Sequence, residues 1–300
     1  MNLKKHVHIF VGEFSYAMNW HSPRLRGEIN STPGDHVVVT YGAFSMLYSN
    51  YVDVVALPED ITLQLQHPAT IGVRPDDTTP DYVINFCRSL FPGAMIHTPR
   101  HIFAGESDPP GIFTHLHPDS QCEEFIINFL SDFRKENTIC ILPKLRQVGG
   151  KSGQNWGKDN WISLITNLIE TGYNIVSINI SDSNNAGGTY DLDIDSNMFR
   201  TLYIDKNDIN ALDKQSWLLK HTMCSIYGST GAANLPFWVN TPTISIMKKD
   251  CGIRLLYNWQ KRLTNNHKLN DIILIDDLEN SMYSDISDRI HTHLNMLQTI

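Results

Sequence analysis

The chain has 300 residues, of which 41% are hydrophobic and 19% charged, a composition typical of a folded globular protein and not of a disordered one. Its net charge of -8 and pI of about 5.9 argue against nucleic acid as a partner, because proteins that bind nucleic acid usually carry a basic face. No apolar stretch approaches the roughly 20 residues that span a bilayer, and the one in residues 1–11 is too short for a signal peptide. Five widely spaced cysteines without a CxxC pair favour buried thiols, so we expect a cytoplasmic protein.

The first half of the chain alternates short apolar runs with helical segments. The strand-like runs are rich in β-branched residues and occupy residues 7–11, 37–40 and 52–57. Helices are predicted over residues 16–29, with a break at Pro23, and over residues 81–91. Such alternation is typical of βαβ units and a mainly parallel sheet. Residues 98–120 are rich in His, Pro, Gly and Asp, which indicates a loop near a domain boundary.

The second half repeats this pattern. A helix is predicted over residues 121–135, where Phe125, Phe129 and Phe133 recur at every fourth position and Ile126 with Leu130 widens the same apolar stripe. Another helix begins with Asp159 as its N-cap and ends at Gly172, and a last helix covers residues 281–297. The helix that begins at Asp159 carries one apolar face, formed by Trp161, Leu164, Ile165 and Leu168. The strands of the second half are predicted at residues 138–142, 173–180, 224–227, 243–247 and 272–275. We therefore expect an α/β protein with two similar halves.

The strongest local signal follows the strand of residues 224–227, where small residues precede a predicted helix. Backbone N–H groups and the positive end of a helix dipole suit a phosphate or diphosphate, and the hydroxyls of Ser229 and Thr230 add donors. The alternative is a tight strand-to-helix turn with a hydroxyl N-cap. The residues predicted to bind here are Ser229, Thr230, Gly231, Ala232 and Asn234.

A second signal lies just after the strand of residues 138–142. Lys144 and Arg146 follow its carboxyl end and Lys151 lies in the next loop, so cations gather where ligands of open α/β sheets bind. Together they can neutralise a diphosphate, and Arg can do so with two hydrogen bonds. Asn155 and Trp156 are expected to shape a nucleotide pocket. The alternative is a solvated basic loop.

A third signal follows the first strand, where Glu13 is placed to take a proton from a hydroxyl. The alternative is an exposed loop carboxylate. His21, Arg24 and Arg26 lie on the next segment, where they form either an acceptor pocket or an ordinary polar helix face.

Other polar groups are expected to have no role in a site. Asp191, Asp193 and Asp195 form a D-x-D-x-D pattern, which we interpret as the outer face of an edge strand and not as a metal site. His115 and His117 lack further ligands at a zinc spacing. His6 and His8 are expected to form the polar face of the first strand. No GxGxxG follows that strand, and no GxxxxGK[ST] or GxSxG occurs, which argues against nicotinamide enzymes, P-loop nucleotidases and α/β-hydrolases.

Residues 229–244 resemble the donor-site signature of the lipopolysaccharide heptosyltransferases, which runs Asp-Ser-Gly, two residues, His-Leu-Ala, a small-residue stretch and Thr-Pro-Thr. Residues 142–161 are similar to the same family's strand, cationic loop and Trp-containing helix start. Gly12-Glu13 with Pro23 resembles its Gly-Asp and downstream Pro. The matching positions in the first segment are Thr230, Gly231, Leu235, Thr241, Pro242 and Thr243. The departures are Ser229 for Asp, Asn234 for His, Pro236 for Ala and Glu13 for Asp.

The resemblance implies the GT-B fold, with two Rossmann-like domains facing a cleft. It places the domains at residues 1–120 and 121–280, with a helix at 281–300 that crosses back to the first. It further implies a glycosyltransferase of the hexosyl- or heptosyltransferase kind that inverts configuration, uses a nucleotide-sugar without a metal or other cofactor, and has Glu13 as its base. The acceptor is then a glycan or a lipid-linked glycan of surface polysaccharide synthesis, reached at the inner face of the membrane. A nucleotide-sugar epimerase, a pyruvyl transferase and a non-catalytic sugar-binding module stay open as alternatives.

Overall fold

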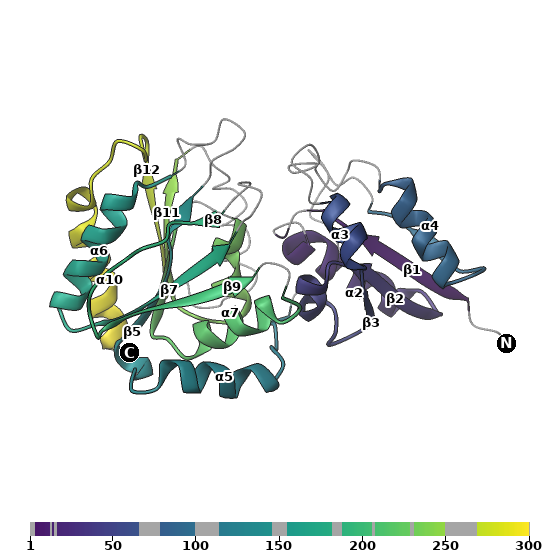
Figure 1. The fold of residues 1–300 in the computed structure, drawn as a ribbon, viewed down its shortest axis with the longest axis horizontal. Coiled ribbons are helices and arrows are strands. Elements are labelled where there is room, and N and C mark those ends of the chain that lie inside the picture. The colour runs from purple at the N-terminus through teal and green to yellow at the C-terminus, as the bar shows by residue number, and fades with distance from the viewer. Residues whose placement is uncertain are drawn as a thin grey trace. The chain divides into compact units, whose positions relative to one another are not determined.

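The computed structural model describes residues 4–12, 14, 17–65, 79–99, 114–145, 155–181, 188–205, 208–228, 231–249 and 269–299. Two compact units make up the chain: residues 1–117 with 207–212, and residues 118–206 with 213–300. Each unit contains its own parallel sheet (Figure 1). None of the described helices is long and apolar enough to cross a membrane.

The first unit is built on a four-stranded sheet of order β3-β2-β1-β4, in which every neighbouring pair is parallel. Its strands are β1 (Lys5–Phe10), β2 (Asp35–Thr40), β3 (Asp53–Ala56) and β4 (Met95–His97). One face carries the apolar residues Val7, Ile9, Val37 and Val39, which pack with side chains of α3 (Glu59–Leu65) and α4 (Asp81–Leu90). The expected parallel sheet is confirmed here.

The segment after β1 is helical in two pieces. A π-helix, η1 (Ala17–His21), leads into α2 (Ser22–Ser31), and a 3-10 helix, η2 (Gly42–Leu47), follows β2. Pro23 lies in the first turn of α2, where its missing N–H costs no hydrogen bond. The predicted break at Pro23 is therefore the start of a helix.

The second unit has a six-stranded parallel sheet of order β12-β11-β10-β5-β7-β9. Its strands are β5 (Thr138–Leu142), β7 (Asn174–Ser181), β9 (Phe199–Asp205), β10 (Cys224–Tyr227), β11 (Thr243–Lys248) and β12 (Asn270–Ile275). Successive strands run outward from β5 to one edge and then from β10 to the other. This is the Rossmann strand order, with its reversal between β5 and β10.

Helices α6 (Lys158–Glu170) and α10 (Ser287–Gln298) cover one face of this sheet, and α7 (Ala211–Lys220) lies on the other side (Figure 1). The core of the covered face joins Ile139, Ile226 and Ile244 to the buried stripe of α6, which consists of Trp161, Leu164, Ile165 and Leu168 as predicted. Ile290 and Leu294 place α10 in the same core. The expectation that this helix also packs on the first domain stays a prediction, as do the domain limits.

Gly172 ends α6 in the predicted way. Its φ is +95°, and its N–H donates to the carbonyl of Ile169 at 2.9 Å while that of Tyr173 donates to the carbonyl of Leu168 at 3.0 Å. These two bonds form the Schellman motif, which favours glycine because only glycine adopts this backbone without strain.

Several predicted elements differ from the structure. Helix α5 (Gln121–Leu130) ends before Ser131, whose φ is 52°. Ile126 and Leu130 of the predicted stripe are buried, whereas Phe125 is 46% exposed. Helix α6 begins at Lys158 after Gly157, so Asp159 is a first-turn residue that favours the helix dipole and not the N-cap. A 3-10 helix, η7 (Tyr283–Asp285), precedes α10, which starts later than predicted. The sequence reasoning missed α3, β4, β9 and α7.

Candidate functional site

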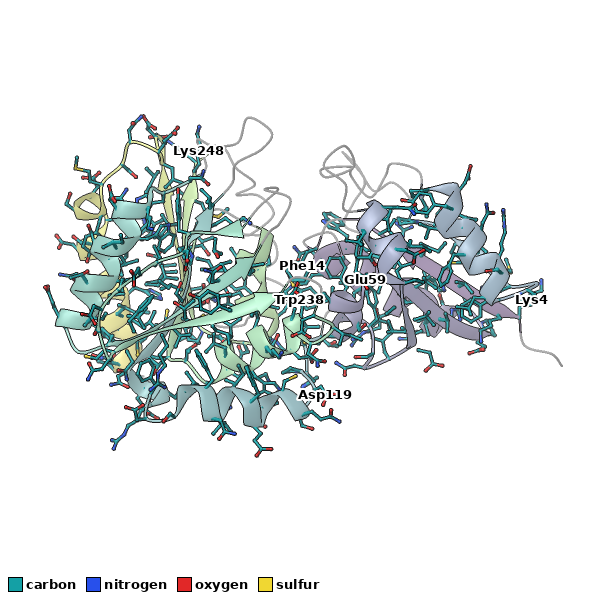
Figure 2. All side chains as sticks on the ribbon, viewed as in Figure 1. Lys4, Phe14, Glu59, Asp119, Trp238 and Lys248 are labelled. Atoms are coloured by element: carbon teal, nitrogen blue, oxygen red, sulfur yellow. The ribbon has the colours of Figure 1, made fainter. Side chains whose placement is uncertain are left out.

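The carboxyl ends of β5 and β10 form the reversal point of the second sheet. The two strands are parallel neighbours, with Tyr227 opposite Leu142 at their ends. Lys248, labelled in Figure 2, is the last residue of β11 and marks the same carboxyl edge. A crevice-binding ligand of a Rossmann sheet lies at such a point, because the helices on its two sides cover opposite faces.

Lys144 lies directly beyond β5. It belongs to a short strand, β6 (Lys144–Leu145), which pairs antiparallel with β8 (Gly188–Thr189), and its side chain is half-buried. The structure thus brings one predicted cation to the reversal point. The other two, Arg146 and Lys151, lie outside the described residues.

The turn after β10 begins at Gly228, whose N–H donates to the carbonyl of Leu142 at 3.3 Å. Ser229 and Thr230 are outside the described residues. Gly231–Asn234 forms a 3-10 helix, η5, followed by α8 (Leu235–Trp238), which is a single turn. The helix predicted after the small residues is therefore very short, and its macrodipole adds little to an anion site, since a macrodipole needs many aligned peptides.

Gly228 lies against two other segments, a contact that the sequence reasoning missed. A Cβ atom added to it would lie 3.2 Å from Cζ2 of Trp161 and 3.3 Å from Cβ of Lys144. The N-terminal part of α6, the end of β5 and the end of β10 therefore meet at one glycine. The only signal in the sequence was a glycine directly after a buried strand.

The predicted pocket residues near α6 lie at different depths. Trp156 is 1% exposed, and its ring packs edge-on against Trp161 at 5.0 Å between ring centroids. Within the described residues neither indole N–H has a hydrogen-bond partner. Asn155 is half-buried, and Asn234 is buried at the start of α8. Trp156 thus lies beneath the surface, and its role in a nucleotide pocket stays a prediction.

The residues set aside as metal ligands do not come together. Asp191, Asp193 and Asp195 are exposed outside any strand, and Asp191 accepts a hydrogen bond from Nδ2 of Asn179 at 2.9 Å. The interpretation of the aspartates as an edge strand is wrong, because the edge strands of this sheet are β9 and β12 and the aspartates belong to neither. No group of three or more His, Cys, Asp or Glu side chains that could hold a metal occurs within the described ranges.

The first sheet has the same reversal, between β1 and β4. Val11 and Gly12 follow the carboxyl end of β1, and Glu13, the predicted base, lies outside the described residues. The position of its side chain in the fold thus stays a prediction.

The predicted acceptor residues make contacts inside the first unit. Nδ1 of His21 lies 3.0 Å from the hydroxyl of Tyr48, and burial lowers the pKa of His21 to about 3, so this imidazole is neutral at physiological pH. Arg24 pairs with Glu28 at 3.3 Å. Arg26 stacks over the ring of Tyr51 at 4.3 Å and donates to the hydroxyl of Thr114. Their role toward an acceptor stays a prediction.

Four histidines, the histidine quartet, lie on the α2 side of the first sheet: His6, His8, His36 and His97. Nδ1 of His6 lies 3.0 Å from Nε2 of His97, and Nε2 of His8 lies 3.0 Å from Nδ1 of His36. The first pair stacks on the second, with His6 over His36 at 4.8 Å and His8 over His97 at 4.7 Å. His6 and His8 form the polar face of β1 as predicted, and this face is buried, since the two side chains are only 6% and 4% exposed.

Solved structures match the chain over nearly its whole length. ADP-heptose LPS heptosyltransferase II of E. coli has a TM-score of 0.54 at 12% identity and covers 98% of this chain and 99% of its own. E. coli heptosyltransferase WaaC with ADP-2-deoxy-2-fluoro heptose has a TM-score of 0.56 at 10% identity, and the match covers 96% of this chain and 99% of that one. A glycosyl transferase family 9 protein of Veillonella parvula reaches 0.60 at 8% identity over 99% of each chain.

The chain has the fold of these glycosyltransferases. The predicted fold class, α/β with two Rossmann-like domains of the GT-B type, is thereby confirmed, and the resemblance to heptosyltransferases holds at the level of the fold. No protein-family model and no curated protein matches the sequence. Because the identities are only 8–12%, activity must be argued from the site.

Proposed function

We propose that the chain is a glycosyltransferase that moves a sugar from a nucleotide-sugar to a hydroxyl of a glycan or lipid-linked glycan. The observation that carries this proposal is the strand reversal between β5 and β10, with Lys144 on one side and the Gly228 turn on the other. A cation beside closely approaching backbone suits a diphosphate. The shared fold supports the same choice, since WaaC has been solved with ADP and with an ADP-heptose analogue.

The donor half of the site would hold the leaving group. Lys144, Arg146 and Lys151, with the backbone of residues 229–232, bind the diphosphate and stabilise its charge as it departs. Because these cations do that work, the reaction needs no metal. Asn155, Trp156 and Asn234 complete the nucleotide pocket. The resemblance to heptosyltransferases further suggests action in the cytoplasm, at the inner face of the membrane when the acceptor is lipid-linked.

The acceptor half would supply the base. The acceptor oxygen attacks the anomeric carbon on the face opposite the diphosphate, so the carbon–oxygen bond to the diphosphate breaks and the configuration inverts. The acceptor proton passes to the carboxylate of Glu13. His21, Arg24 and Arg26 lie on the segment after Glu13 and would border the acceptor.

Replacing Glu13 by Gln removes the base and keeps the shape of the side chain. We expect Glu13→Gln to lower turnover by roughly a hundredfold or more, while the dissociation constant for the donor stays within about twofold. Transfer assays and calorimetric titration of the same preparation measure both. Wild-type turnover in this variant would remove Glu13 from the mechanism.

The donor can be found by thermal shift with ADP, GDP, UDP and CDP and their sugars, with and without EDTA. A ligand at about 100 times its dissociation constant stabilises the fold by about 2.7 kcal/mol. We expect one of the diphosphates to raise the melting temperature, by the same amount with and without EDTA. Lys144→Ala should raise the dissociation constant of that diphosphate about tenfold, since a direct cation–phosphate contact is worth roughly 1.4 kcal/mol or more. Product analysis then separates transfer from an isomerised donor or a ketal. Binding without any turnover would favour a sugar-binding module.

A further inference from the structure

Gly228 is a glycine because of the space around it and not because of its backbone. Its φ lies outside the left-handed region, so the backbone alone would accept any residue. The space would not, because an added Cβ would meet Cζ2 of Trp161 at 3.2 Å and Cβ of Lys144 at 3.3 Å. Separations this short require a neighbour to move by a few tenths of an ångström.

The ring of Trp161 has little freedom to make that movement. It is fully buried, it packs edge-on against Trp156, and it belongs to the core that joins α6 to β5 and β10. Protein interiors are packed as densely as organic crystals, so a ring held on all sides transmits a push to its neighbours. The indole is therefore a fixed surface against which the Gly228 turn rests.

Lys144 touches the same glycine from the other side. Its backbone N lies 3.6 Å from the added Cβ position, and the end of β5, two residues before Lys144, is tied to Gly228 by the 3.3 Å hydrogen bond to the carbonyl of Leu142. One contact therefore sets the distance between the segment that carries Lys144 and the turn that begins at Gly228.

We propose that Trp161 is a positioning residue that holds the Lys144 segment and the Gly228 turn at the spacing a nucleoside diphosphate requires. The inference rests on the proposed function, because these are the two elements assigned to the diphosphate. Two groups bind the same ligand together only when they lie at a defined separation. A shift of well under 1 Å in that separation therefore lowers the affinity for the ligand without unfolding the protein.

The test combines a methyl added at Gly228 with a ring made smaller at Trp161. We expect Gly228→Ala to raise the dissociation constants of ADP, GDP, UDP or CDP, whichever binds the wild type, by about tenfold or more, in line with a lost charge-assisted contact. Trp161→Phe lacks the Cζ2 atom that the new methyl meets. The double variant should therefore bind within about threefold of Trp161→Phe alone, by relief of the overlap.

A matched control separates positioning from simple core packing. Leu168 is fully buried in the same helix and core, but none of its atoms is among the three nearest to a Cβ added at Gly228. Leu168→Ala should lower the melting temperature at least as much as Trp161→Phe and leave the dissociation constant unchanged. Equal losses of affinity in both variants, in proportion to lost stability, would show that Trp161 is only a core residue.

Three further outcomes decide the matter. Unchanged affinity in Gly228→Ala would overturn the inference and leave the proposed function intact. Failure of the wild type to bind any of the four diphosphates would overturn the proposed function and the inference with it. If Gly228→Ala does not fold, the double variant decides instead: folding with the affinity of Trp161→Phe supports the inference, and weaker binding contradicts it.

Discussion

Lowering the pH from 7.5 to 5.0 should loosen the first unit, because burial in the histidine quartet favours the neutral forms of His6 and His8. The quartet is hydrogen-bonded to the chain after α2, since Nε2 of His36 lies 2.9 Å from the carbonyl of Thr32 and Nδ1 of His36 lies 3.0 Å from Nε2 of His8. Burial first, and then the neighbouring histidines, lower the pKa of His8 to about 3. Burial, with His36, His97 and Lys4, lowers that of His6 as well.

The size of the effect follows from His8 alone. An unfolded histidine has a pKa of about 6.5, so between pH 6.5 and 3 the unfolded chain binds more protons than the folded one, and stability falls as the pH falls. At pH 5.0 the loss is about 2 kcal/mol relative to neutral pH, on the order of thirtyfold in the opening equilibrium. His21, whose pKa is lowered by burial and by Arg24, adds a loss of the same sign.

Hydrogen exchange followed by peptide mass spectrometry reports β1, β2 and β4 separately from the second unit. After correction for intrinsic rates, we expect protection of these strands to fall about thirtyfold or more between pH 7.5 and 5.0. His8→Asn should be less stable at neutral pH but lose less on acidification. His221→Asn, which removes a half-buried histidine from the second unit, should keep the wild-type difference. Equal protection at the two pH values, or an undiminished loss in His8→Asn, would refute this reasoning.

Two other predictions concern the second unit. Gly172→Ala should lower the free energy of unfolding by about 1 kcal/mol in urea titration, because φ of +95° is unfavourable for alanine although no atom lies within 4 Å of the added Cβ. A loss no larger than that of a surface substitution would contradict the Schellman assignment. Changing Asp191, Asp193 and Asp195 together to Asn should leave donor binding and turnover unchanged with or without added divalent cations, because these side chains form no ligand cluster. Loss of cation-dependent turnover would restore the metal site.

The sequence by itself determined most of the second sheet and the buried side of α6. Strands β5 and β10 are mostly apolar and buried along their whole length, because strands of a covered parallel sheet are buried on both faces. The stripe of α6 and its end at Gly172 depend only on residues within about four positions of one another. The prediction failed in α5, where the positive φ of Ser131 ends the helix although the apolar repeat continues to Phe133. It also failed for Phe125, which faces solvent.

Only the tertiary structure decided which of these elements are neighbours. The reversal point joins residues about 85 positions apart, because β10 pairs with β5 and not with β9. The histidine quartet likewise requires the register that places His36 opposite His6 and His97 opposite His8. Sequence periodicity shows which face of a strand is buried, but not which strand lies beside it, since pairing depends on how the whole chain packs.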